Sequence, residues 1–268
     1  STTTDGTFTV TQGKVEGLSL TSAEFDNSTD YINLGNHDEF SFGDGSSDSP
    51  FTFAAWIRAD DMQNNMILGT LNQYKFGLNS SRKLFLTLFD NGTTNREVQT
   101  TTDDLSSFQD KWVHVAATYN GVGGTSANAG INLYVNGVAV AMTAVDGGTY
   151  VAMHNLTNDT FIGYYDGEAT AAFDGEIGEF RIYNQELSAE QIASLYSKTL
   201  AFTPSHLYRL DEGSGTTAND TGTATTRNGT LINDTTYVNG TLDLDGTLTI
   251  AANGTMSCPR GNLDLEGD

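Results

Sequence analysis

Cysteine, proline, long apolar runs and basic residues are all scarce in this sequence. The single cysteine, Cys258, excludes an intramolecular disulfide and a cysteine-based zinc site. No run of about 18 apolar residues is present, so we expect no membrane insertion. The 12 Lys+Arg against 34 Asp+Glu give a net charge of −22. Nucleic acids and anionic membranes are therefore not expected partners, because both attract basic surfaces.

The residues that are abundant favour a β-rich globular protein. The hydrophobic fraction of 37% and the aromatic fraction of 10% can build a core. The 29 glycines beside only 3 prolines indicate short strands joined by tight turns. The length of 268 residues predicts one large domain with a smaller remainder. No secretory signal is visible and the sequence starts at Ser1, so we interpret it as part of a longer protein.

Period-two alternation of apolar residues predicts most of the strands. Clear examples are 51–58, 83–89, 112–119 and 131–135, with others around 30–34, 66–70, 73–78, 95–101, 160–165 and 176–183. Asn136-Gly137 between two apolar runs predicts a hairpin, because both residues tolerate the positive φ of a type I′ turn. One short helix is predicted from Ser188 to about 197, since Ser188 and Gln191 form a capping box. This pattern is typical of a β-sandwich or jelly roll.

The pattern changes after the predicted helix. Thr203-Pro204 marks a linker at 199–205, and the strong core motifs do not recur beyond it. Residues 206–268 carry short apolar runs between Gly-, Thr- and Asn-rich stretches. We therefore predict a jelly-roll domain at 1–198 and a smaller, incomplete β segment at 206–268 that continues further or packs on a neighbour.

Six motifs occur in a recognisable order over about residues 14–197. They are Phe25-Asp26-Asn27 with Asp30-Tyr31-Ile32, the strand at 51–57, the Trp-Val-His-Val-Ala strand at 112–119, the Tyr-Val-Asn-Gly hairpin at 133–137, the strand at 173–184, and the helix beginning Leu187-Ser188. Together they resemble the laminin-G-like family of concanavalin A-like jelly rolls. Residues 207–216 and 227–231 are similar to the beginning of a second copy.

The resemblance implies two kinds of site. One is a calcium ion, which takes six to eight oxygen ligands. Because the first and last strands of such jelly rolls tend to pair, we expect its ligands among Asp26, Asn27, Asp174 and Glu176. The alternative is that these residues only form turns.

The other implied site is a glycan-binding face, which needs an aromatic platform and a few polar groups. Its candidates lie near predicted strand ends or loops: Tyr74, Asp90, Asn91, Tyr164, Tyr165 and Asp166. Adjacent strand residues face opposite ways, so one of Tyr164 and Tyr165 is expected to point outward. The alternative is that exposed tyrosines merely cover the sheet. Trp56 and Trp112 are assigned to the core.

Catalysis is not expected. Glu176-Ile177-Gly178-Glu179 is the only dense acidic motif on a predicted strand, and it lacks the spacing of jelly-roll glycoside hydrolases. On a regular strand Glu176 and Glu179 would also face opposite sides. The four histidines show no Ser-His-Asp or Cys-His arrangement.

Asn-X-Ser/Thr sequons are frequent, and they are glycosylation candidates if the protein is exported. The alternative is chance in a Thr-, Ser- and Asn-rich chain. The sequon asparagines are Asn27, Asn79, Asn91, Asn155, Asn158, Asn219, Asn228, Asn233, Asn239 and Asn253.

Two functions follow from the sequence. The first is a non-catalytic recognition module, outside the cell or on a virion surface, that binds glycans or surface proteins with the help of calcium. The alternative is a structural subunit of a surface filament, surface layer, or viral appendage or shell. Such a subunit would associate with its own copies through strand edges of the C-terminal β segment.

Overall fold

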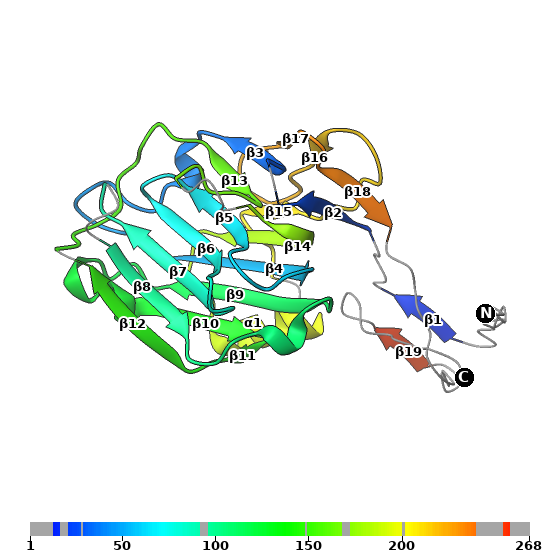
Figure 1. Ribbon diagram of the computed structural model, residues 1–268, viewed down its shortest axis with the longest axis horizontal. Helices are drawn as coiled ribbons and strands as arrows, with labels where there is room; N and C mark the ends of the chain where they lie inside the picture. The colour runs from blue at the N-terminus through cyan, green and yellow to red at the C-terminus, as the bar shows by residue number, and fades with distance from the viewer. Residues whose placement is uncertain are drawn as a thin grey trace.

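The computed structural model of the chain is a sandwich of two antiparallel β-sheets (Figure 1). It describes residues 13–16, 21–27, 29–91, 96–147, 149–167, 172–199, 202–239 and 254–257. The predicted all-β jelly roll is confirmed, and the predicted helix is α1 (Ala189–Ser197). Within the described ranges no helix has the length and apolarity needed to cross a membrane.

The first sheet has the order β11-β10-β9-β4-β14-β2-β18, with β15 also paired to β14. Its strands are β2 (Thr21–Asp26), β4 (Phe51–Ala59), β9 (Val113–Tyr119), β10 (Ile131–Val135), β11 (Val138–Ala139), β14 (Asp174–Tyr183), β15 (His206–Tyr208) and β18 (Thr236–Asn239).

The second sheet has the order β12-β8-β7-β6-β5-β13-β3-β17-β16. Its strands are β3 (Tyr31–Gly35), β5 (Met66–Thr70), β6 (Tyr74–Leu78), β7 (Leu84–Phe89), β8 (Arg96–Thr101), β12 (Met142–Gly147), β13 (Thr160–Ile162), β16 (Thr217–Ala218) and β17 (Gly229–Ile232). Three 3-10 turns complete the fold: η1 (Asp38–Phe40), η2 (Ser106–Phe108) and η3 (Gly124–Gly130).

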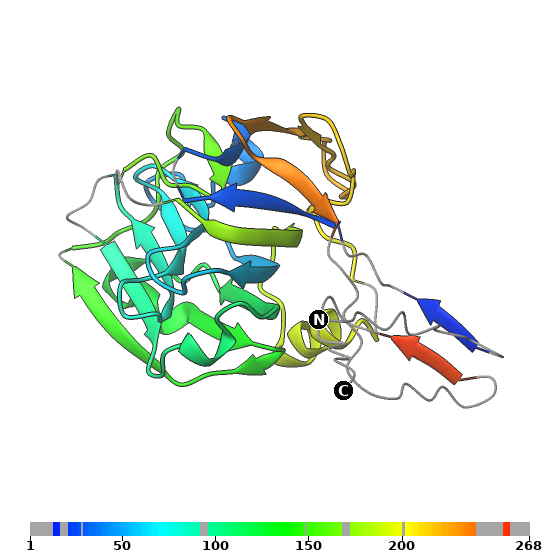
Figure 2. The same cartoon turned by 45° about the vertical axis from the view of Figure 1, so that its right-hand side comes forward.

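A separate pair of strands lies outside the sandwich. β1 (Gly13–Glu16) and β19 (Gly254–Ser257) pair in parallel, and both views show them standing apart from the two sheets (Figures 1 and 2).

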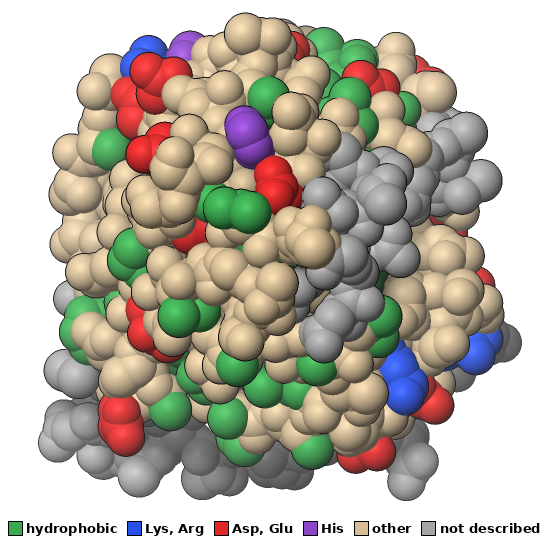
Figure 3. All heavy atoms as spheres, turned by 90° about the vertical axis from the view of Figure 1, so that its left-hand side faces the viewer, with side chains coloured by type: hydrophobic (Ala, Val, Ile, Leu, Met, Phe, Trp, Pro, Cys, Tyr) green, Lys and Arg blue, Asp and Glu red, His purple; other side chains and the backbone are tan. Residues whose placement is uncertain are grey.

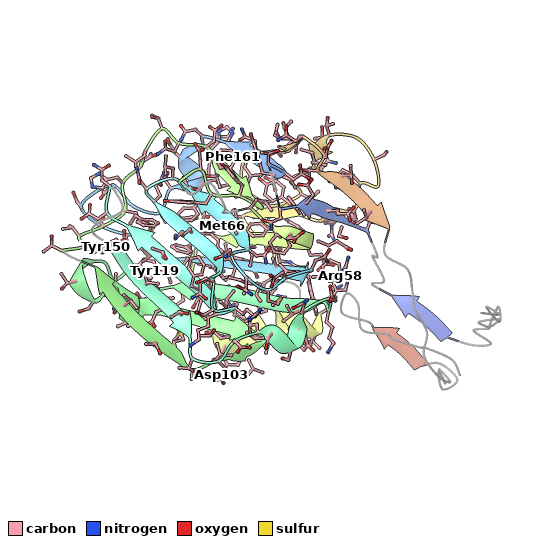
Figure 4. All side chains as sticks on the ribbon, viewed as in Figure 1. Arg58, Met66, Asp103, Tyr119, Tyr150 and Phe161 are labelled. Atoms are coloured by element: carbon pink, nitrogen blue, oxygen red, sulfur yellow. The ribbon has the colours of Figure 1, made fainter. Side chains whose placement is uncertain are left out.

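The core lies between the two sheets and is rich in aromatic side chains. Phe51 and Phe53 of β4 pack against Tyr74 of β6 with ring centroids 6.2 and 5.2 Å apart. At one end of the sandwich, the hydroxyls of Tyr119 and Tyr150 donate to Asp48 Oδ2 at 2.6 and 2.7 Å. Figure 4 shows these two tyrosines near each other, far from Arg58 at the opposite end.

Helix α1 covers the outer face of the first sheet. Its side chains Ile192 and Leu195 pack on Ala54 and Ala116, whose small size lets the helix approach the strands. The predicted capping box is confirmed, because Ser188 Oγ accepts from Gln191 N and Gln191 Oε1 accepts from Ser188 N.

The predicted hairpin is also confirmed, with Asn136 and Gly137 at φ 49° and 78°. A side chain at Gly137 would meet Tyr196 at 2.9 Å, so glycine also serves the approach of α1. Trp56 is buried beneath the helix with its ring stacked on Tyr196. Trp112 is partly exposed, so its assignment to the core is wrong.

The division of the chain after residue 205 differs from the sequence prediction. Residues 206–239 do not form a second module, because their strands join both sheets of the same sandwich. β15 pairs with β14, β17 pairs with β3, and β18 forms the edge beside β2 (Figure 2). Their apolar side chains, including Tyr208 and Leu210, belong to the main core. The segment therefore packs on the jelly roll of its own chain. Except for β19, residues beyond 239 lie outside the described part.

Candidate functional site

A groove of about 360 Å³ opens on the outer face of the second sheet. Strand pairing aligns its centre in one row, because Val145, Val98, Thr87 and Lys75 are successive cross-strand partners on β12, β8, β7 and β6. The residues that line the groove are Lys75, Asn79, Phe85, Thr87, Phe89, Val98, Thr100, Val145, Tyr165 and Gly167.

Three aromatic rings form the floor of the groove, and one lysine lies over them. Phe85, Phe89 and Tyr165 are only 7%, 3% and 1% exposed. Lys75 Nζ lies 5.6, 6.0 and 5.4 Å from their respective ring centroids. These distances are within the range of cation–π attraction, which favours this position of the ammonium group. A ligand in the groove would therefore meet the Lys75 side chain above the rings.

Polar side chains lie along the walls of the groove. The Thr100 hydroxyl is buried and has no hydrogen-bond partner among the described residues. Asn79 is held in a turn, because its Oδ1 accepts from the backbone N–H of Ser81 at 2.8 Å and of Lys83 at 3.2 Å. A few placed polar groups beside apolar surface are typical of small-ligand sites.

The predicted glycan-binding residues do not gather in one place. Tyr74 is fully buried between the sheets, where its hydroxyl donates to Phe40 O at 2.9 Å. Burial raises the pKa of Tyr74 to about 12. Its predicted role on a binding face is therefore wrong, because it faces the core while its neighbour Lys75 faces outward.

Tyr164 and Tyr165 lie beyond the end of β13, since Gly163 at φ 84° breaks the strand. Tyr165 stacks on Phe89 and forms part of the floor of the groove. Tyr164 is half-buried and stacks on Tyr31, with centroids 5.2 Å apart, and both pack edge-on to Phe161. The expectation that the two tyrosines face opposite ways is wrong, because it assumed a regular strand: both lie on the outer side of the second sheet, with Tyr164 the more exposed.

Asp90 has a structural role at the end of β7. Its carboxylate accepts from Val151 N at 3.0 Å and lies 3.1 Å from His154 Nε2. Asn91 is exposed in the turn that follows, at φ 40°. Asp166 is exposed and lies close enough to Tyr164 that its charge adds to the effect of burial in raising the tyrosine pKa.

Sequence reasoning missed Lys75, Phe85 and Phe89. The signal was present, since Lys75 and Gly77 alternate with Tyr74, Phe76 and Leu78 along one strand. The apolar set marks the core side, so Lys75 had to point outward. On β7 both faces carry large apolar residues, and alternation alone does not reveal which of them face the groove.

A family model of the laminin G type, described as the concanavalin A-like lectin/glucanases superfamily, matches residues 26–193. The chain belongs to this superfamily. No curated protein sequence matches it significantly.

Several solved structures are similar to this chain at low sequence identity. A Bacteroides ovatus protein provisionally described as carbohydrate-binding matches 82% of this chain at 21% identity, with a TM-score of 0.56, and the match covers 60% of that protein. A Ruminococcus gnavus sialidase CBM40 domain bound to α2,3-sialyllactose matches 67% of this chain and 100% of that domain, at 13% identity and a TM-score of 0.49. Domains LG4-5 of the mouse laminin α1 chain match 63% of this chain and 42% of theirs, at 15% identity and a TM-score of 0.42.

The residues expected to bind calcium are partly brought together in this superfamily member. Asp26 on β2 and Asp174 on β14 are direct cross-strand partners. Burial raises the pKa of Asp174, and the nearby carboxylates of Asp60, Asp61 and Asp26 raise it further. Asn27 follows at φ 59°, and its N–H donates to Phe173 O at 2.9 Å.

Glu176 is not available to that cluster, because its carboxylate pairs with the Arg58 guanidinium and accepts from Ser22 Oγ at 2.5 Å. Across the described ranges, no group of three or more His, Cys, Asp or Glu is arranged to hold a metal ion. The four expected ligands therefore do not form one metal-binding set, although the Asp26–Asp174 pair remains.

The acidic motif on β14 is occupied by ion pairs. A bulge in the register around Glu179, whose φ is 50°, places its side chain near His114, on the same outer face as Glu176. The prediction of opposite faces is therefore wrong, because it assumed a regular strand. Glu179 pairs with Arg181 at 2.8 Å and Lys198 at 3.1 Å, whereas Glu176 pairs with Arg58.

The sequon asparagines differ in exposure. Asn27, Asn91, Asn155, Asn219, Asn228 and Asn233 are exposed, whereas Asn79 and Asn158 are half-buried. The side chain of Asn239 and the whole of Asn253 lie outside the described part. Asn79 lines the groove, so a glycan attached there would occupy it.

Proposed function

We propose that the protein is a non-catalytic recognition module that binds glycans in the groove of the second sheet. The observation that carries this proposal is the groove itself, with aromatic rings beneath and Lys75, Asn79 and Thr100 along its surface. Its volume of about 360 Å³ suits one or two sugar rings by the usual size of small-ligand pockets. The apolar C–H face of a pyranose complements Val98 and Val145, and its hydroxyls complement the polar walls.

Two further observations support this proposal. A structure of the same fold is described, provisionally, as carbohydrate-binding. The carboxylates of Glu176 and Glu179 are each committed to basic partners, which disfavours their use as an acid–base pair. The excess of acidic residues suits an exported protein, and the extracellular or virion-surface setting is part of the proposal.

Filling the groove should abolish binding. We expect Val98→Trp to remove the signal of wild-type protein on a glycan array, because indole would occupy the centre of the groove. Val122→Trp is the matched control, since Val122 is 59% exposed outside the groove lining. Equal binding by both variants and the wild type would contradict the proposed site. Loss only in Tyr164→Ala would move the site to the Tyr31–Phe161–Tyr164 cluster.

Calcium at Asp26 and Asp174 stays a prediction. The mutual repulsion that contributes to the raised pKa of Asp174 would be relieved by a cation. We expect a chelator to lower the melting temperature of the wild type, and to have no effect on Asp174→Asn. A wild-type melting temperature that is the same with chelator and with added calcium would remove calcium from the proposal.

The alternative, a subunit that assembles through strand edges, also stays a prediction. It is supported by the place of β18, from the C-terminal segment: among the described residues β18 is an edge of the first sheet, and an edge strand has one side that can pair with another chain. Ordered polymers from the purified protein, together with an inert glycan array, would favour this function over recognition.

A further inference from the structure

The groove carries a basic side chain at its centre, in a chain that has few of them. Lys75 is the one basic residue among the described groove-lining residues, and the whole chain has 12 Lys+Arg against 34 Asp+Glu. On the face shown in Figure 3, acidic side chains are scattered widely and basic ones lie near its margins. A lysine inside the groove is therefore unlike the general charge of the surface.

The position of Lys75 is defined by its surroundings. The ammonium group is within 6.0 Å of three ring centroids. Gly69, the cross-strand partner of Lys75, has no side chain, and Tyr165 packs over it. Contact with the ring faces favours a fixed place for the ammonium group. An ammonium group has three N–H donors, so it can donate to a ligand while it keeps its protein contacts.

We propose that the groove selects sugar rings that carry an anionic group, a carboxylate or a sulfate, through Lys75. The inference rests on the proposed function of the groove and names its ligand class. The anionic group would accept from Lys75 Nζ, and the Thr100 hydroxyl, which has no partner among the described residues, would serve a ring hydroxyl or the same anion. A neutral sugar would offer no negative charge to the Lys75 ammonium group.

The net charge of −22 opposes the approach of an anion but does not cancel the contact. Repulsion from distant carboxylates is screened over about 8 Å at physiological salt, whereas a contact within a partly enclosed groove is screened much less. Non-specific binding of a polyanion to a basic patch would weaken steeply as salt rises. Binding through Lys75 should therefore persist at about 0.15 M salt.

Matched sugar pairs test the inference directly. Titration calorimetry would compare α-1,4-linked trimers of galacturonic acid and of galactose, which differ only in a carboxylate or hydroxymethyl group at C6. Glucuronic/glucose and mannuronic/mannose oligomers, and a 6-sulfated galactose oligomer, complete the panel. We expect the acidic member of at least one pair to bind about 10- to 100-fold more tightly, the range of a charge-assisted hydrogen bond.

Lys75→Met should remove that preference by weakening the acidic member far more than the neutral one, because methionine keeps an apolar chain over the rings but carries no charge. Lys111→Met, an exposed lysine outside the groove lining, is the matched control and should bind as the wild type does. Neutral sugars that bind as tightly as acidic ones, or a Lys75→Met variant with unchanged preference, would overturn the inference while the glycan function stands. If no sugar of any pair binds, the inference is overturned too. If the glycan array also shows no binding, the proposed function is overturned as well.

Discussion

Replacing Asp220 by alanine should lower the free energy of unfolding of the entire sandwich by about 3–5 kcal/mol, as expected when several buried hydrogen-bond donors lose their acceptor. The Asp220 carboxylate is buried and accepts from the backbone N–H groups of Leu207, Gly222 and Arg227 at 2.9–3.0 Å. It also lies 2.7 Å from Nδ1 of the buried His206. Burial alone would raise the pKa of Asp220, but these hydrogen bonds bring it below its ordinary value.

The loss should be global because the segment that Asp220 organises is part of the main core. Alanine would leave three N–H groups and an imidazole without their acceptor. Each of these buried donors then destabilises the folded state, because water inside the protein cannot fully replace the lost hydrogen bond. Tyr208 and Leu231, which flank this network, pack in the core with residues of both sheets.

Urea unfolding followed by tryptophan fluorescence would measure the effect. Asp234→Ala is the control, since Asp234 is an exposed carboxylate in the same segment. A stability of Asp220→Ala within about 0.5 kcal/mol of the wild type, the usual range for surface substitutions, would contradict the expectation. Two separate transitions in the wild type would show instead that residues 206–239 unfold on their own.

Acid should destabilise the protein through His114, well before most carboxylates are protonated. His114, on β9, is fully buried beneath α1. Its ring centroid lies 5.4 Å from that of Trp56 and 6.1 Å from that of Tyr196. Neither ring nitrogen has a hydrogen-bond partner among the described residues. Burial, reinforced by the charge of Arg181, lowers the pKa of His114 to about 3.

The direction of the pH effect follows from proton binding in the two states. Between pH 3 and the ordinary histidine pKa of about 6.5, the unfolded chain binds a proton that the folded chain does not. The stabilising contribution is thus complete above pH 6.5 and is lost as the pH falls toward 3. At 1.36 kcal/mol per pKa unit, the loss approaches about 4–5 kcal/mol at the acid end.

The test compares how stability changes with pH in two variants. We expect unfolding of His114→Phe to depend less on pH between 6.5 and 4 than unfolding of the wild type, whatever its stability at pH 7. His37→Phe, at a half-buried histidine in the loop between β3 and η1, controls for the loss of any histidine. An unchanged pH slope in His114→Phe would show that His114 does not carry the effect.

The features that could be predicted from sequence depend on short-range signals. The turn at Asn136-Gly137 and the capping box at Ser188 each need only a few adjacent residues, and both are confirmed. The place of the C-terminal strands could not be predicted in this way. β17 and β18 gain their partners from β3 and β2, about 200 residues earlier in the chain, and no local pattern encodes that pairing.

The site was harder to predict than the fold because exposure depends on which face a residue takes. Tyr74 and Lys75 are neighbours in sequence, yet the Tyr74 side chain is buried in the core and the Lys75 side chain lines the groove. The criterion of an aromatic residue near a strand end predicts Tyr74 as a binding residue and does not include Lys75. A single bulge had a similar effect in β14, where Glu179 takes a left-handed backbone and changes its face.

The pairing of β2 with β18 has a mechanical consequence. Thr21, where β2 begins, lies opposite Asn239, where β18 ends, so a tension applied to these two points pulls the antiparallel strands apart from one end. Their hydrogen bonds would break one after another, as in a zipper, rather than all together as in shear. Under load, β18 would detach first and expose the edge of β2, while the groove on the opposite sheet stayed intact.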